Sequence, residues 1–233
     1  MYTNNTVIDI DGFTLGLEGP LVIEMPPMPE VTSDDIDAQL FAYVANARQG
    51  SPITTIYDLD DAWASESFPG INTMQELRSI IEEQIRQDNA YGYQNLKYAR
   101  CADALVAALE GEIPQEAIDA NLDEVRKQSE MTIRSYGESL PQYLSRNGLS
   151  EKEFEAEIVA ETEHVIALNV ALDILVRDSG EEIEEHELLL YLSVNDIDSF
   201  FDEARETGKL DVAKQAAARV KTMRALIDAA CIV

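Results

Sequence analysis

The two histidines of this chain are the side chains best suited to acid–base or metal chemistry. His164 follows Glu161 by three residues, a spacing at which one helix can present a carboxylate and an imidazole to the same metal ion. Such a site needs a second copy of the pair and further inward carboxylates, and His186 falls on a different predicted helix. Cys101 and Cys231 lack the spacing of zinc ligands, and their Ala-rich and Leu-rich surroundings predict buried structural thiols. We therefore interpret both histidines as ordinary surface residues and expect no metal and no cofactor.

Other catalytic signatures are missing from the sequence. It contains neither of the glycine-rich motifs that cradle nucleotide phosphates, and the stretch from Gly12 to Gly19 has the wrong spacing and precedes no helix. No serine stands in a G-x-S-x-G motif. Carboxylates are so frequent that no pair stands out as an acid and a base. The sequence predicts a protein that is not an enzyme and has no catalytic residue.

Charge is the most uneven feature of the composition. The chain has 45 Asp and Glu residues against 17 Lys and Arg residues, a formal net charge of −28. Such a surface repels phosphate backbones and anionic lipids, so we expect the chain to bind no nucleic acid and no membrane, and not to bind ribosomes stably. The same charge favours basic polypeptides as partners.

The hydrophobic pattern predicts no membrane-spanning segment. The most apolar stretch, Val165 to Val176, is interrupted by Asn169 and Asp173 and is too short to cross a bilayer. The first residues form neither a basic region nor an apolar core, as a secretory signal would. We expect a cytoplasmic protein.

Apolar residues recur at helical spacing along most of the chain, which predicts a mainly α fold. Thr73 with Glu76 and Ser150 with Glu153 have the spacing of capping boxes, which would begin two long helices. Gly92 leaves open a bend or break in the first of these. The predicted helices are approximately 32–48, 58–65, 73–110, 114–137, 140–146, 150–180 and 210–231, with two further segments, 188–192 and 196–206, before the last of them.

The first thirty residues differ from the rest. Alternating apolar and polar residues flank Asp11 and Gly12, which is typical of a hairpin, and residues 21–25 form a second extended run. Three prolines between residues 26 and 29 then favour an extended connector. We predict a short β segment and connector over residues 1–30, a helical domain over residues 31–233, and no strand after residue 30.

Aromatic and large aliphatic side chains gather near the predicted helix breaks at Gly137, Gly148 and Gly208. Such residues are usually part of a core, but helical hairpins too long to bury every apolar face would leave some exposed. Exposed rings and flexible thioethers suit promiscuous binding. The candidate polypeptide-binding residues are Met131, Tyr136, Leu140, Tyr143, Leu144, Leu192, Phe200 and Phe201.

The order of these elements, with several short motifs, resembles the trigger factor family after residue 30. The resemblance is carried by Glu30-Val-Thr-Ser-Asp-Asp-Ile-Asp, by Ile113-Pro-Gln-Glu-Ala-Ile-Asp, by Leu140-Pro-Gln-Tyr-Leu and Leu149-Ser-Glu-Lys-Glu-Phe, and by the last helix ending in Ala225-Leu-Ile-Asp-Ala-Ala-Cys-Ile-Val. The basic Gly-Phe-Arg signature of the family's ribosome-docking loop has no counterpart. The connector after Arg48 is too short for the family's prolyl-isomerase domain, because a domain needs at least ~50 residues.

The resemblance implies a long-helix body with two projecting helical arms, one over about residues 114–180 and the other over about residues 181–217. A cradle for unfolded or nascent polypeptides would lie between them. The leading hypothesis is an ATP-independent holding chaperone without isomerase or ribosome-docking activity. The alternatives are a structural or assembly scaffold for one dedicated protein partner and, well behind it, a helical metal enzyme built on Glu161 and His164. The sequence leaves client identity and oligomeric state open.

Overall fold

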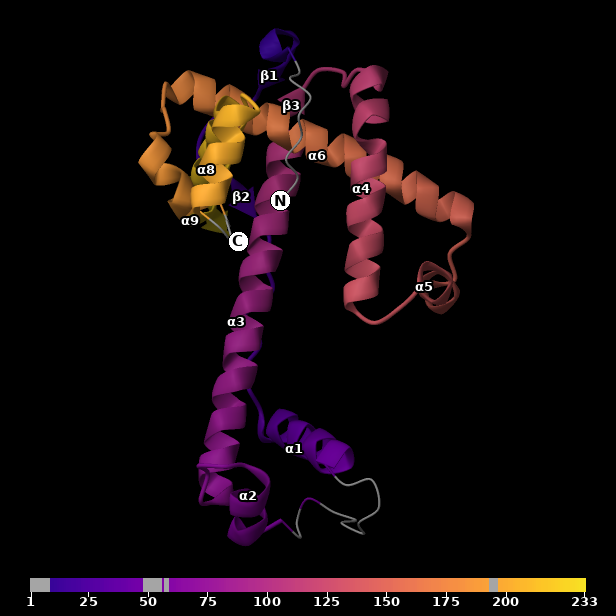
Figure 1. Cartoon of the computed structure of the whole chain (residues 1–233), viewed down its shortest axis with the longest axis vertical. Helices are drawn as coiled ribbons and strands as arrows, with labels where there is room; N and C mark the ends of the chain where they lie inside the picture. Colours follow the sequence, from indigo (N-terminus) through magenta and orange to yellow (C-terminus); the bar gives the residue numbers. More distant parts are fainter. Residues whose placement is uncertain (1–8, 48–55, 57–58, 193–196) are drawn as a thin grey trace. The chain divides into compact units, whose positions relative to one another are not determined.

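The computed structural model describes residues 9–47, 56, 59–192 and 197–233, which fall into two compact units (Figure 1). One unit, the larger, combines residues 1–24 with residues 100–233, and the smaller unit comprises residues 25–99. The described residues contain nine α-helices and four strands of two residues each. The predicted mainly α fold with a short β segment near the N-terminus is confirmed.

Three helices build the smaller unit: α1 (Ser33–Ala47), α2 (Asp61–Ser67) and the greater part of α3 (Met74–Ala107). Their apolar faces meet in a core of Leu40, Val44, Trp63, Ala64, Leu77 and Ile81. The predicted cap at Thr73 is present, since the Glu76 amide donates to the Thr73 hydroxyl at 3.1 Å and the Thr73 amide donates to the Glu76 carboxylate at 3.2 Å. The helix continues without a break through Gly92.

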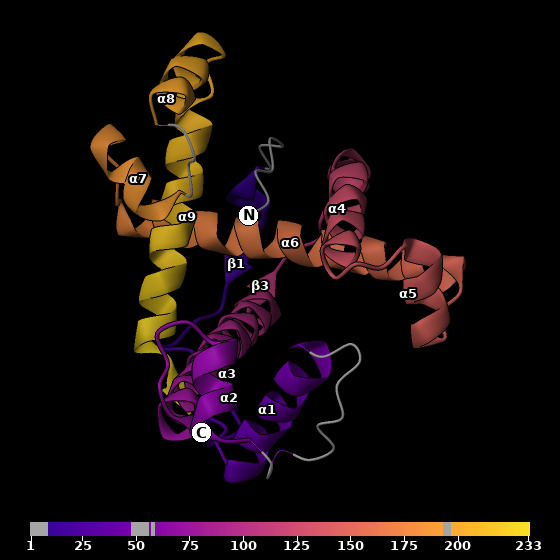
Figure 2. The same cartoon turned by 60° about the horizontal axis from the view of Figure 1, so that its bottom comes forward.

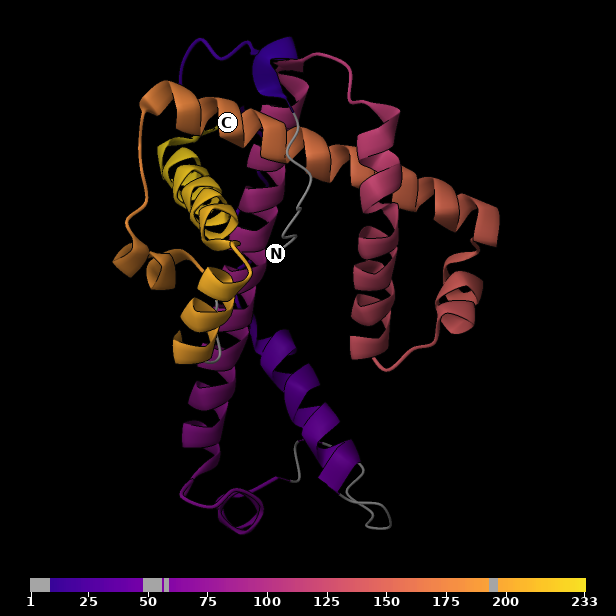
Figure 3. The same cartoon turned by 45° about the horizontal axis from the view of Figure 1, so that its top comes forward.

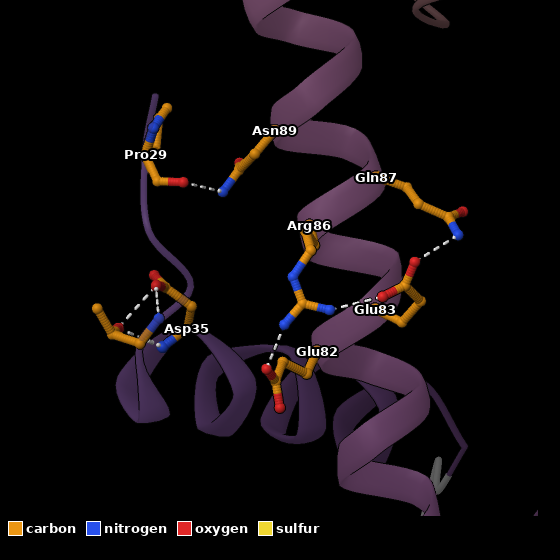
Figure 4. A network of polar contacts seen from close by, with 8 residues as sticks. Pro29, Asp35, Glu82, Glu83, Arg86, Gln87 and Asn89 are labelled. Atoms are coloured by element: carbon orange, nitrogen blue, oxygen red, sulfur yellow. Dashed lines mark hydrogen bonds and ion pairs between the residues drawn. The ribbon is translucent and has the colours of Figure 1, made fainter. Parts of the chain in front are cut away.

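The start of α1 and the connector before it are held by polar contacts within the smaller unit (Figure 4). The Asp35 carboxylate accepts hydrogen bonds from the Thr32 hydroxyl at 2.6 Å and from the Thr32 amide at 2.9 Å, and these bonds lower the pKa of Asp35. The Asn89 side chain of α3 donates to the carbonyl of Pro29 at 3.4 Å. Thr32 thus caps α1, close to the start of the helix that the sequence predicts from about residue 32.

The larger unit is organised around α6 (Glu151–Ser179), whose N-terminal half carries α4 (Gln115–Ser135) and α5 (Leu140–Asn147) (Figure 2). The Ser150 amide donates to the Glu153 carboxylate at 2.8 Å and the Glu153 amide donates to the Ser150 hydroxyl at 3.2 Å, so α6 begins at the predicted capping box. Gly180, at a φ of 63°, ends it in the left-handed conformation that terminates many helices.

The C-terminal half of α6 packs against α9 (Leu210–Ala229), with α7 (Leu188–Tyr191) and α8 (Ile197–Glu206) beside α9 (Figure 3). Arg219 of α9 donates two hydrogen bonds to the Asp173 carboxylate of α6, at 2.7 Å and 2.6 Å. Both side chains are only 13% exposed, so this bidentate ion pair fixes the two helices to each other.

The strand predictions are partly wrong. Instead of a hairpin, residues Ile10–Gly12 form a 3₁₀ turn in which the Asp9 carboxylate accepts the Asp11 amide at 3.0 Å. β1 (Thr14–Leu15) pairs antiparallel with β3 (Leu109–Glu110), and β2 (Val22–Ile23) pairs in parallel with β4 (Cys231–Ile232). Two strands therefore lie after residue 30, because each short N-terminal strand finds its partner far along the chain.

Gly111, the residue after β3, has a backbone conformation and a close neighbour that require glycine. Its φ is 140°, and a Cβ there would lie 2.3 Å from the ring of Phe13. Phe13 is buried in the core of the larger unit with Ile118, Ile166 and Val170. Only glycine lets the backbone pass this close to the ring.

The two cysteines differ from each other. Cys101 is buried in α3, as predicted, but Cys231 is exposed on β4, so the prediction of a buried thiol is wrong there. The last helix ends at Ala229, two residues before Cys231, and the two-residue strand that follows does not bury the thiol.

Candidate functional site

A hollow of about 490 Å³ lies where α4, α5 and α6 meet, and we call it the α4–α6 hollow. Its apolar walls come from Ile133 at the end of α4, from Tyr143 of α5 and from Phe154 and Ile158 of α6. Tyr136, which follows α4, also lines it and is 80% exposed. The hollow is therefore an open surface feature with aromatic walls.

Local turns place these rings. α4 stops at Tyr136, where Gly137 turns the chain at a φ of 77°. The Ser150 capping box sets where α6 begins and so places Phe154 in the first turns of that helix. The rings of Tyr143 and Phe154 then meet edge to face with their centres 6.4 Å apart. This contact joins α5 to α6 and forms the inner wall of the hollow.

Charges surround the rings. The Arg146 guanidinium lies 5.8 Å from the centre of the Tyr143 ring and 3.1 Å from the Glu138 carboxylate. Glu157 and Glu161 line the opposite side from α6, one helical turn apart, and both are exposed. Neither carboxylate forms an ion pair with any residue that the structure describes. The hollow thus combines aromatic walls with an excess of negative charge.

A second hollow of about 250 Å³ lies between α8 and α9, and we call it the α8–α9 hollow. Leu192, Phe200 and Val212 form its apolar lining, while Glu203 and Lys209 supply charges. The Phe200 and Phe201 rings lie 5.4 Å apart, and the Arg205 guanidinium lies 5.7 Å from the Phe201 ring centre. The hollow is smaller and more apolar in its lining than the first.

The structure distributes the predicted binding residues between these hollows. Tyr136 and Tyr143 come together in the α4–α6 hollow, and Leu192 and Phe200 come together in the α8–α9 hollow. Phe201 contacts the Phe200 ring edge to face and is half-buried, but it does not line the hollow.

The remaining predicted residues lie outside the linings. Met131 is exposed on α4 but does not line the α4–α6 hollow. Leu140 is half-buried against the core that Val125, Ile133 and Phe154 form. Leu144 belongs to that core and is only 8% exposed, so it supports the wall without presenting a surface.

Sequence reasoning did not assign the charged residues of the α4–α6 hollow to a binding surface, and it considered Glu161 only as a metal ligand. Glu157 and Glu161 repeat at four-residue spacing beside the apolar stripe of Phe154 and Ile158, a signal that marks one helix face. Arg146 follows Tyr143 by three residues, which places the two on one face of α5. The overall abundance of carboxylates concealed these particular ones.

Among the described residues, Glu161 and His164 belong to no group of side chains placed to hold a metal ion. The His164 imidazole lies 3.8 Å from the Asp103 carboxylate. Over the described ranges of the chain, no group of three or more His, Cys, Asp or Glu side chains is placed to hold a metal ion. In the same ranges no helix combines the length and the apolar character needed to cross a membrane.

Comparison with known proteins points to one family. The family described as bacterial trigger factor protein (TF) C-terminus matches residues 73–228, which contain both hollows. The trigger factor of Ureaplasma urealyticum serovar 10 is 29% identical over 135 residues, which are 55% of this chain and 29% of that protein. The trigger factor of Halothermothrix orenii is 24% identical over 131 residues, 56% of this chain and 30% of that protein. The chain thus spans about a third of the length of these relatives.

Proposed function

The chain belongs to the family of bacterial trigger factor C-termini, and from this membership and the two hollows we propose that it is a chaperone that holds unfolded or nascent polypeptides. The observation that carries the proposal is the α4–α6 hollow, an open, aromatic-lined surface inside the matched region. The helices α4–α6 act as one arm, over about residues 114–180. The helices α7 and α8 with the first part of α9 act as the other, over about residues 181–217, and client segments bind to the apolar surfaces of both.

The proposed mechanism is binding without catalysis. Weak contacts with exposed rings delay aggregation, since each ring supplies contact area at little cost in side-chain entropy. The mechanism uses no ATP and no cofactor. It also involves no prolyl isomerisation, because the connection between Ala47 and Asp61 is shorter than the ~50 residues of a small domain. Family membership is also the reason to propose a cytoplasmic location.

Charge biases the choice of clients. At a net charge of −28 the chain attracts basic polypeptides and repels ribosomal RNA, so it binds clients without docking stably on the ribosome.

The alternative function is a scaffold that holds one native partner on the same surfaces. The exposed Tyr136 is compatible with both functions.

The number of different proteins that the chain binds distinguishes a chaperone from a scaffold. Three unrelated denatured proteins are diluted into buffer with increasing amounts of the chain, without nucleotide, and aggregation is followed by light scattering. The chaperone proposal predicts suppression of all three at near-stoichiometric amounts. Suppression of none, together with tight binding of a single native partner, would establish the scaffold instead.

A further inference from the structure

We propose that the α4–α6 hollow binds the side chain of a lysine or arginine in an extended, apolar segment of a client polypeptide. The inference rests on the proposed holding function and assigns to one hollow a chemical specificity that an apolar surface alone would lack. Its receptors are the Tyr136 ring and the Glu157 and Glu161 carboxylates, all of which line the hollow.

The chain itself contains an example of this mode of binding. Arg146 places its guanidinium 5.8 Å from the centre of the Tyr143 ring and pairs with Glu138 at 3.1 Å. A cation over an aromatic face, closed by a carboxylate, is attracted by both the ring quadrupole and the negative charge. Tyr143 and Glu138 are thereby occupied, whereas the Tyr136 ring and the other two carboxylates of the hollow have no such internal cation among the described residues.

Glu157 and Glu161 explain why the occupant is a cation. They lie one turn apart on α6, where like charges repel and destabilise a helix by a small amount. Other carboxylates around this corner have a cationic partner: Arg126 pairs with both Asp123 and Glu155 at the α4–α6 contact. A bound lysine or arginine would relieve the repulsion that the chain leaves between Glu157 and Glu161.

The apolar side chains of the hollow favour a cation that carries an apolar stem. Ile133, Phe154 and Ile158 form apolar walls, so the occupant must bring apolar atoms along with its charge. The methylene stem of lysine or arginine does so, and flanking apolar residues of an extended segment extend the contact. The volume of about 490 Å³ is within the usual range of ligand pockets, about 300–1,000 Å³.

The test compares two labelled, unstructured peptides that differ at one position. One carries a lysine among apolar residues, and the other has methionine in its place. Binding of each is measured by fluorescence anisotropy with the whole chain, with Glu157→Gln/Glu161→Gln, and with the control Glu163→Gln/Glu182→Gln. The control pair is also exposed, makes the same change of charge, lines neither hollow and forms no ion pair with described residues.

We expect Glu157→Gln/Glu161→Gln to weaken binding of the lysine peptide about threefold to tenfold, as for two exposed ion pairs. Binding of the methionine peptide should change little, and the control pair should bind both peptides nearly as the original chain does. Tyr136→Leu, which keeps an apolar side chain, should also weaken the lysine peptide more than the methionine peptide.

Four outcomes would overturn the inference. Equal loss in the control pair would show that only overall charge matters, and equal binding of the two peptides by the original chain would show that the hollow is merely apolar; in both cases the holding function stands. Failure of either peptide to bind at all would overturn the holding function as well. A change in oligomeric size of Glu157→Gln/Glu161→Gln, with unchanged peptide affinity, would make a second copy of the chain the occupant.

Discussion

Tyr136 and Phe154 line the same hollow, but the fold depends on them to different degrees. Phe154 is buried against Val125 and Leu144 and contacts the Tyr143 ring. Tyr136 is 80% exposed and follows the last turn of α4. One ring therefore holds the hollow together, and the other is free to contact a ligand.

This difference predicts opposite effects of truncation. Phe154→Ala should lower the free energy of unfolding by about 3–5 kcal/mol, because it leaves a cavity in the core of α4, α5 and α6. Tyr136→Ala should change it by no more than about 0.5 kcal/mol, as for an exposed residue. Urea unfolding followed by circular dichroism measures both, and equal losses would mean that Tyr136 is part of the core.

The cap at Ser150 predicts a dependence of stability on pH. Hydrogen bonds from the Ser150 hydroxyl and amide lower the pKa of Glu153 below its ordinary value. A lowered pKa in the folded state means that the ionised carboxylate contributes stability above the unfolded pKa, and that this contribution is lost as the pH falls through the folded pKa.

Ser150→Ala should therefore destabilise the protein at pH 7, by about 1 kcal/mol as for other N-caps, and by less in acid below the ordinary glutamate pKa. Melting temperatures of both proteins across this pH range measure the difference. Glu153→Gln is the control, since its amide accepts hydrogen bonds but does not titrate. A pH-independent difference for Ser150→Ala would contradict the assignment.

At the level of residues, local chemistry is what the sequence predicts well. The caps at Thr32, Thr73 and Ser150 depend only on neighbours three positions away, and all three are present. Burial was harder to predict. Leu144 and Tyr143 are adjacent, yet only Leu144 is buried, because burial depends on where α4 and α6 pack.

At the level of elements, α6 is the helix to which the rest of the larger unit attaches. α4 and α5 pack on its N-terminal half and α9 on its C-terminal half, where Asp173 and Arg219 pair (Figure 2). Asp173→Ala would leave the Arg219 guanidinium unpaired at 13% exposure, with a cost of about 3 kcal/mol, the low end for buried ion pairs.

The consequence of Asp173→Ala should be local to the α6–α9 contact. Hydrogen exchange should speed up in α9 more than in α4, because only α9 loses its ionic contact with α6. The matched variant Asp178→Ala removes an exposed carboxylate of α6 and should leave both rates nearly unchanged. Uniform acceleration in both helices would mean that the larger unit unfolds as one cooperative block.

Helix positions followed from periodicity and caps, whereas strand pairing did not. Thr14 of β1 and Glu110 of β3 are 96 positions apart in the sequence. The partner of β2 is β4, near the end of the chain. Pairing over such distances depends on packing that local patterns do not encode. The site was also predicted only in part. Rings near helix ends were identified from the sequence, but their grouping into two hollows depends on how the helices pack.

At the level of the whole molecule, net charge limits the partners. With a charge of −28, the chain should not remain bound to ribosomes, whose surface is rich in RNA phosphate. Co-sedimentation at micromolar concentration and low salt measures this, and we expect the chain in the supernatant. Salt-sensitive recovery in the ribosomal pellet would show that a basic surface overcomes the net charge.

The central claim is that exposed apolar side chains beside the α4–α6 hollow hold clients. Tyr136→Ser/Met131→Ser removes two such side chains, 80% and 52% exposed, and Tyr91→Ser/Met28→Ser removes a matched pair from the smaller unit, 71% and 50% exposed.

The decisive measurement is light scattering of a denatured client in the presence of each variant, with the melting temperature determined in parallel. The account predicts that Tyr136→Ser/Met131→Ser loses at least about half of the suppression with an unchanged melting temperature, while Tyr91→Ser/Met28→Ser suppresses as the original chain does. Full suppression by Tyr136→Ser/Met131→Ser, or an equal loss in both variants, would contradict it.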